Sequence, residues 1–209
     1  MGLMVGTGSA GAEGGSRRLR TPSIEVEQAL VDAAEVVLVR AGPAGVTVRA
    51  VAEQAGVAPM GVYNRFGGKD GLIETLLVRA FDGLRAAVAA RGETDPVDRL
   101  MQSGRRYRAF ALAQPQHYTV MFGQPRSGDV MSERVQQHAG AAFGELVSHI
   151  EYAMTSGTIA PGDPHDVAQQ IWSSIHGAVA LELNGLVKTP DPGATYERLL
   201  HLLVSGVRP

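Results

Sequence analysis

The chain has 209 residues, of which 44% are apolar and 19% are charged, and its formal net charge is −2. This length is enough for one or two domains with a buried core, and the composition excludes a wholly disordered chain. Because the sequence has no cysteine, disulfides, thiolate metal sites, iron–sulfur clusters and cysteine nucleophiles are excluded. Near-neutral charge does not exclude a nucleic-acid partner, because the placement of basic residues matters more than their sum.

The first segment, residues 1–20, is glycine-rich and ends in a basic cluster of Arg17, Arg18 and Arg20. We expect a disordered arm whose arginines either contact DNA or form an untethered basic tail. No apolar run approaches the roughly 20 residues of a membrane span, and no export signal is recognisable. The sequence therefore predicts a soluble, cytoplasmic protein.

After the arm, the chain consists of predicted helices separated by proline and glycine. The first begins near residue 23 and stops at Gly42-Pro43, where its helical apolar spacing ends. The others are predicted over residues 48–55, 59–66, 69–91, 96–113, 115–122, 130–156, 165–187 and 195–207, with a loop over 123–128. No segment alternates with period two, so the sequence predicts an all-α fold of about nine helices.

The second and third predicted helices have the spacing of a helix-turn-helix. Two short helices that cross closely need a small residue on the first helix, which Ala52 supplies. Gly56 follows four residues later, where the turn requires positive φ, and Val62 follows six residues after that, where an apolar side chain must face back. This spacing favours a DNA-binding unit, although many short helical hairpins in ordinary cores also satisfy it.

The wider segment, over about residues 23–75, resembles the tetracycline-repressor-like (TetR) family of transcription regulators. The matching runs are Thr47-Val48-Arg49-Ala50-Val51-Ala52-Glu53-Gln54-Ala55-Gly56-Val57, then Val62-Tyr63-Asn64-Arg65-Phe66, then Gly68-Lys69-Asp70-Gly71-Leu72. The resemblance implies a helix-turn-helix DNA-binding domain over 21–68 and a helical ligand-binding and dimerisation domain over 69–209, with 69–91 as the connecting helix. A weaker likeness, Trp172 followed by His176-Gly177, is similar to a subgroup of that family.

The DNA contacts are predicted from the hairpin and from the start of the next helix. Phosphate contacts are expected from Thr47, Arg49, Tyr63 and Lys69. Base contacts are expected from Ala58, Pro59, Met60, Gly61 and Asn64, while Arg65 reads guanine or binds a phosphate. The alternatives are that the threonine is only a helix cap, the tyrosine a packed aromatic and the lysine a solvated surface residue. Ala58 stands where the family usually has Ser or Thr, which leaves the operator sequence undetermined.

An apolar ligand pocket is predicted in the C-terminal half. Its candidate residues are Met101, Tyr107, Phe110, Tyr118, Met121, Phe122, Phe143, Met154, Trp172 and His176. The alternative is that most of them are ordinary core residues and that the histidine only bonds a backbone carbonyl. Asp163, His165 and Asp166 are close in sequence but indicate a helix start, so neither a metal nor a cofactor is predicted.

The last two helices carry more apolar residues than one subunit needs, and the resemblance implies that they form a four-helix dimer interface. Its candidate residues are Ile171, Ile175, Ala178, Val179, Leu199, Leu200 and Leu203. A two-fold dimer would place the second hairpin helix of each subunit, predicted over residues 59–66, on one face of DNA. The two helices would lie about 34–36 Å apart, which is one turn of DNA, or a multiple of that distance.

The function predicted is that of a homodimeric repressor released from operator DNA by a small molecule, with helix 69–91 transmitting the change. One alternative is a TetR-like activator, or a protein controlled by a partner through an altered DNA-binding head. A less favoured alternative is a helical enzyme or carrier, since no acid–base set or cofactor motif is assembled in the sequence.

Overall fold

The computed structural model describes residues 23–90, 92–123 and 131–209. The predicted arm 1–20, with its three arginines, and all of the predicted loop 123–128 except Gly123 lie outside these residues. All regular secondary structure in the described part of the chain is helical, which confirms the predicted fold class. Its helices are α1 (Ser23–Gly45), α2 (Val48–Ala55), α3 (Pro59–Phe66), α4 (Lys69–Val88), α5 (Pro96–Ala113), α6 (Pro115–Phe122), α7 (Glu133–Thr155), α8 (Pro164–Leu183) and α9 (Pro192–Gly206).

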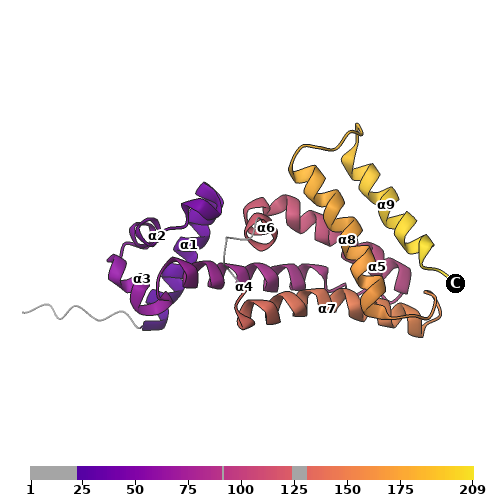
Figure 1. Ribbon diagram of the computed structural model, residues 1–209, viewed down its shortest axis with the longest axis horizontal. Coiled ribbons are helices and arrows are strands. Elements are labelled where there is room, and N and C mark those ends of the chain that lie inside the picture. Colours follow the sequence, from indigo (N-terminus) through magenta and orange to yellow (C-terminus); the bar gives the residue numbers. More distant parts are fainter. Residues whose placement is uncertain (1–22, 91, 124–130) are drawn as a thin grey trace, which may run out of the picture.

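Helix α4 lies parallel to the long axis of the molecule, with α1, α2 and α3 gathered at its first end, α5, α6 and α7 packed on the remainder and α8 and α9 farther from the head (Figure 1). Two separate hydrophobic cores follow this division. The first joins α1, α2, α3 and the start of α4 through buried residues such as Leu38, Val51, Val62 and Leu72. The second joins the rest of α4 to α5–α9. Burial of apolar surface therefore stabilises each end of the molecule, and α4 belongs to both cores.

The helix-turn-helix has the local geometry that its sequence predicts. Thr47 caps α2, since its side chain accepts a hydrogen bond from the Ala50 N–H at 3.1 Å. Gly56 ends α2 in the left-handed region at φ 67°, and the Val57 N–H donates to the Ala52 carbonyl at 3.0 Å. The turn therefore aims α3 back across α2, with Val62 fully buried between them.

Helix α1 continues to Gly45, past the predicted stop, although its backbone is not helical at Gly42 (φ 66°). Four other predicted helix ends differ from the structure by three or four residues. Helix α4 ends at Val88 rather than residue 91, and α7 begins at Glu133 rather than residue 130, because Ser132 caps it through the Val135 N–H. Helix α8 ends at Leu183 instead of residue 187, because Asn184-Gly185 turns the chain with Gly185 at φ 67°. Helix α9 begins three residues early, at Pro192, because Asp191 is its N-cap.

Side-chain contacts made by α6 and by α4 also join the two ends of the molecule. Helix α6 packs against α1, where His117 pairs with Glu35. Arg79 on α4 donates to Asp32 on α1 at 3.1 Å. The head made by α1–α3 is thus attached to the rest of the subunit at two places, one on α4 and one on α6.

Candidate DNA-binding face and ligand cavity

Helix α3 presents an exposed surface that includes two large apolar side chains. Met60 is 63% exposed and Tyr63 is 53% exposed, and Ala58, Pro59 and Asn64 are exposed beside them. Large apolar groups on a free surface are unusual when they gather on one short helix and commonly mark an interaction site. All ten residues predicted to contact DNA are exposed or partly exposed, so each is accessible to a partner.

The predicted phosphate contacts lie at the starts of helices and beside them. The oxygen of Thr47 caps α2, which leaves its hydroxyl proton available to a phosphate oxygen. Lys69 opens α4, and a Cβ atom added at Gly68, just before it, would lie 3.5 Å from the Tyr63 ring. Because free N–H groups and the helix dipole favour anions at these positions, the arrangement suits a DNA backbone.

Arg65 is not extended toward solvent as a base reader would be. Its Nη1 donates to the Gly61 carbonyl on the same helix at 3.3 Å, and its Nε is buried without a partner among the described residues. By contrast, Arg49 and Lys69 form no ion pair with any residue that the structure describes. These two cations are therefore the ones that a phosphate would meet without competition.

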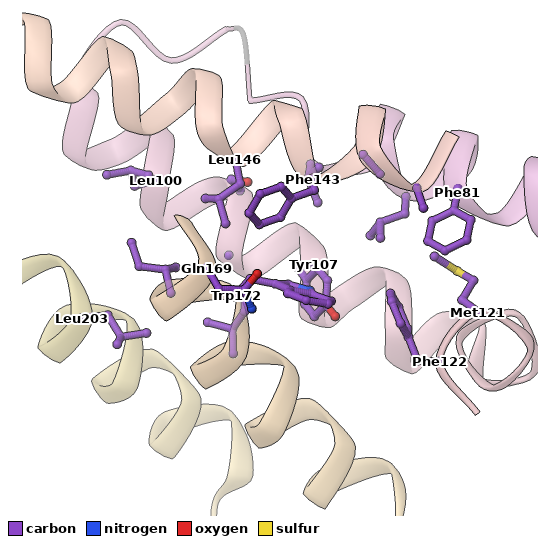
Figure 2. A pocket seen from close by; sticks show the side chains of 18 of the residues that line it. Phe81, Leu100, Tyr107, Met121, Phe122, Phe143, Leu146, Gln169, Trp172 and Leu203 are labelled. Carbon is purple, nitrogen blue, oxygen red and sulfur yellow. The ribbon is translucent and has the colours of Figure 1, made fainter. Parts of the chain in front are cut away.

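A cavity of about 330 Å³ lies inside the C-terminal part, between α4 and the helices that follow it. Figure 2 shows Phe143, Tyr107, Trp172 and Phe122 arranged around it. Of the residues predicted to form a pocket, five line this cavity: Tyr107, Met121, Phe122, Phe143 and Trp172. The remaining five do not line it: Met101, Phe110, Tyr118, Met154 and His176.

Several residues of the cavity wall are absent from the predicted set. Phe81, Leu84 and Val88 of α4 line it, as do Ser103 of α5 and Gln169 of α8. The three α4 residues belong to the buried apolar stripe of that helix. Periodicity identifies such a stripe but does not show where the packing leaves a space.

Four of the residues predicted for the dimer interface lie inside the subunit instead. Ile171, Ile175, Val179 and Leu200 are at most 7% exposed, and three of them line the cavity, with only Val179 packed elsewhere in the core. Leu203 is partly exposed and also lines the cavity. The faces that α8 and α9 turn outward carry other side chains, including Leu181, which is 50% exposed, and Leu202, which is 69% exposed.

A polar cluster adjoins the cavity where α5, α6 and α8 meet. The hydroxyls of Tyr107 and Tyr118 lie 2.9 and 2.8 Å from His176 Nδ1, and 3.4 Å from each other. Burial raises the pKa of both phenols and lowers the pKa of the imidazole. All three groups are therefore uncharged near neutral pH, and the histidine bonds side chains rather than the backbone carbonyl of the alternative prediction.

The cavity wall on α8 is fixed to α5 by an ion pair. Arg108 donates two hydrogen bonds to the Glu182 carboxylate, at 2.7 and 2.6 Å. Bidentate geometry of this kind holds both side chains in place more firmly than a single contact does. In the same region, the Tyr196 hydroxyl of α9 donates to the Gly104 carbonyl of α5 at 2.9 Å.

The short helical hairpin, with its exposed second helix and its cations beside helix starts, defines a helix-turn-helix DNA-binding protein. Two family models match the chain: "Bacterial regulatory proteins, tetR family" over residues 30–76, and "Tetracyclin repressor-like, C-terminal domain" over residues 100–203. The chain belongs to the TetR family and is a DNA-binding transcriptional regulator. This is a family of regulators rather than of enzymes, and its members bind operator DNA and typically act as dimers.

One curated relative agrees with this assignment, and two solved structures share the fold. An HTH-type transcriptional regulator of Mycobacterium tuberculosis is 25% identical over 215 residues, covering 87% of this chain and 92% of the relative. A solved structure of a protein of unknown function from Rhodococcus sp. RHA1 superposes with a TM-score of 0.81 at 22% identity, covering 93% and 100% of the two chains. FadR from Bacillus subtilis, solved in complex with stearoyl-CoA, gives a TM-score of 0.71 at 20% identity, covering 87% and 100%.

No helix in the described part of the chain combines the length and apolar character that a membrane crossing needs. The described residues also contain no group of three or more metal-ligating side chains placed to hold an ion. Asp163, one of the residues weighed as a ligand, caps α8 through the His165 N–H at 2.9 Å.

Proposed function

We propose that the protein is a homodimeric repressor that leaves its operator when a small molecule enters the cavity. One observation carries this proposal: a single helix takes part in both sites. Helix α4 begins with Lys69 at the DNA-binding face, and its later residues Phe81, Leu84 and Val88 form part of the cavity wall. A ligand that displaces this wall changes the position of the head in the same step.

In this proposal, α3 enters the major groove and the neighbouring helix starts hold the DNA backbone. Thr47, Arg49, Tyr63 and Lys69 contact phosphates. The exposed residues Ala58, Pro59, Met60, Gly61 and Asn64 face the base edges. Asn64 is the one member of this second set with a side-chain amide, so it is the best candidate to pair with an adenine.

Arg65 has a different role in the proposal from the one that the sequence suggests. Because its guanidinium bonds the Gly61 carbonyl, it supports α3 from within rather than reading guanine. The set of base contacts is therefore dominated by small and apolar groups. We infer that sequence selectivity comes from contact with thymine methyl groups, from the asparagine and from the spacing of the two heads.

The homodimer is proposed to form through the outward faces of α8 and α9. Leu181 and Leu202 are exposed there, and Ala178 and Leu199 lie partly exposed on the same helices. Obligate interfaces are more apolar than other surfaces. A structure of the same fold, FadR from Bacillus subtilis, is a complex with stearoyl-CoA, which supports a small-molecule effector for this fold without identifying the one used here.

A gel-shift titration with the DNA flanking the protein's own gene tests the DNA-binding face. We expect Lys69→Ala to weaken binding and to reduce the slope of log affinity against log salt by about 0.9, the value for one lost phosphate contact. Lys188→Ala is the matched control, because it removes the chain's other lysine, which is exposed after α8. An unchanged slope in the Lys69 variant would show that this lysine does not contact a phosphate.

A further inference from the structure

The wall of the cavity holds no charge among the described residues. Aliphatic and aromatic side chains make up nearly all of it, and neither an acid, an arginine, a lysine nor a histidine of the described chain contributes. A charged group in such surroundings would lose its hydration without gaining a partner, which costs far more than burial of a neutral polar group. The wall therefore favours an uncharged molecule.

One polar side chain in this wall has no partner. Ser103 lies on α5, is only 4% exposed and lines the cavity. Its hydroxyl makes no hydrogen bond to any residue that the structure describes, although buried hydroxyls are nearly always bonded. A helical serine can satisfy itself on the carbonyl four residues earlier, as Thr75 does on Gly71 at 2.8 Å. Ser103 does not do so, which leaves its donor and its acceptor for a ligand.

A second polar atom lies one helical turn away on the same helix. Tyr107 also lines the cavity, and its hydroxyl shares His176 Nδ1 with the hydroxyl of Tyr118. A neutral imidazole nitrogen has one lone pair or one proton, while the two phenols together bring two protons. The phenol that does not donate to His176 Nδ1 has only the 3.4 Å contact with the other hydroxyl, which is longer than a normal O–H···O hydrogen bond. An oxygen atom placed beside Tyr107 can therefore compete for that proton.

We propose that the cavity binds an uncharged, mainly apolar molecule whose hydroxyl or carbonyl oxygen pairs with Ser103 and faces Tyr107. The volume of about 330 Å³ lies near the lower limit of about 300–1,000 Å³ for small-molecule pockets. Since a water molecule occupies about 30 Å³ of liquid, the space accommodates roughly ten non-hydrogen groups. A ten-carbon primary alcohol matches this size and chemistry.

The fluorescence of Trp172 measures binding directly, because the chain contains one tryptophan and its side chain lines the cavity. Three ten-carbon probes carry a neutral, an anionic and a cationic head group: 1-decanol, decanoate and decylammonium. Each is titrated at pH 7.5, the alcohol below its solubility limit and the two ions below their micellar concentrations. We expect 1-decanol to give a saturable change in emission and the two charged probes to bind at least tenfold more weakly. Equal affinity for all three, or no saturable change with 1-decanol, would overturn the proposal.

Variants assign the binding to the proposed atoms. Ser103→Ala removes one hydrogen bond and should weaken 1-decanol binding about fivefold. The matched control Ser148→Ala makes the same change at an exposed position on α7 and should leave the affinity unchanged. Ala139→Phe places a ring on another wall residue and should abolish the fluorescence response. If Ser103→Ala binds 1-decanol as tightly as the unmodified protein, the assignment to Ser103 is wrong.

This inference rests on the proposed role of the cavity as the effector site, but the two fail in different experiments. The titrations contain no DNA, so a negative result leaves the DNA-binding face unaffected. If 1-decanol binds as expected and the protein stays on its operator at saturating alcohol, then release from DNA by this class of molecule is excluded while the chemistry of the cavity stands.

Discussion

Gly71 lies at the corner where the hairpin passes into α4, and the backbone approaches it closely. A Cβ atom at this position would lie 1.9 Å from the Phe66 carbonyl oxygen and 2.8 Å from its carbonyl carbon. Neither atom belongs to a flexible side chain, so α3 and α4 would have to separate. This single residue therefore fixes how closely α3 is held to α4.

Two glycine-to-alanine changes in helices should have opposite effects on stability. Gly71→Ala is expected to lower the free energy of unfolding by about 1–3 kcal/mol, because the added methyl group overlaps backbone atoms. Gly140→Ala in α7, where nothing lies within 4 Å of the new Cβ, should raise it by about 0.5–1 kcal/mol. Urea unfolding of both variants measures this difference. Equal effects would show that the backbone around Gly71 accommodates a Cβ atom.

His176 should make stability depend on pH. Burial lowers the pKa of His176 below its usual 6.5, so the unfolded chain binds a proton at a higher pH than the native one. The free energy of unfolding should therefore fall as the pH drops below about 6.5, by at most about 1.4 kcal/mol per pH unit. His176→Gln should remove this dependence, and His165→Gln, at an exposed position on α8, should retain it. Identical pH profiles for the two variants would contradict the assignment.

At the scale of elements, α6 connects the cavity with the DNA-binding head. Its final residues Met121 and Phe122 line the cavity, and His117 near its start pairs with Glu35 on α1. The sequence predicts transmission through the connecting helix alone. The contact between α6 and α1 adds a second route, which sequence could not show because it joins residues 82 positions apart.

The two routes are separated by one substitution on α6 and one on α1, because Glu35 itself also lies 3.9 Å from Arg79. His117→Asn removes the contact of α6 with Glu35, while Asp32→Asn weakens the contact of α1 with Arg79 on α4. We expect the His117 variant to lose more of the coupling between ligand and DNA, on the order of 0.5–2 kcal/mol, with little change in DNA affinity without ligand. The measurement is operator affinity with and without saturating 1-decanol. A larger loss of coupling in the Asp32 variant would assign transmission to α4.

Both ends of four helices were predictable because their signals are local. Thr47 and Gly56 act within one turn of the chain, and the predicted bounds of α2, α3, α5 and α6 match the structure. The role of each face of α8 and α9 was not predictable in the same way. Ile171 and Ile175 belong to an apolar stripe that serves equally well as core or as interface, and the packing of α5, α7 and α9 against α8 decides that it is core.

At the scale of the whole molecule, the outward faces of α8 and α9 lie at the opposite end from the head (Figure 1). If a two-fold axis passes through these faces, both heads point the same way and can meet successive turns of one DNA duplex. Affinity then depends on two sets of contacts held at a fixed spacing. This explains how a protein of net charge −2 can be a DNA-binding regulator without a strongly basic surface.

A charge placed on the outward face should therefore abolish tight DNA binding without touching the head. Leu202→Asp puts a carboxylate where an exposed leucine of α9 stands, and two-fold symmetry repeats the change in the partner. At about 2 kcal/mol for each central apolar side chain, the two copies together weaken dimerisation roughly a thousandfold. Val39→Asp is the control, since Val39 is 62% exposed but lies on α1. Sedimentation equilibrium should show that the Leu202 variant is monomeric and that the Val39 variant stays dimeric. Operator affinity should fall in the Leu202 variant, because the dimer is lost. A dimeric Leu202 variant would place the interface on another surface.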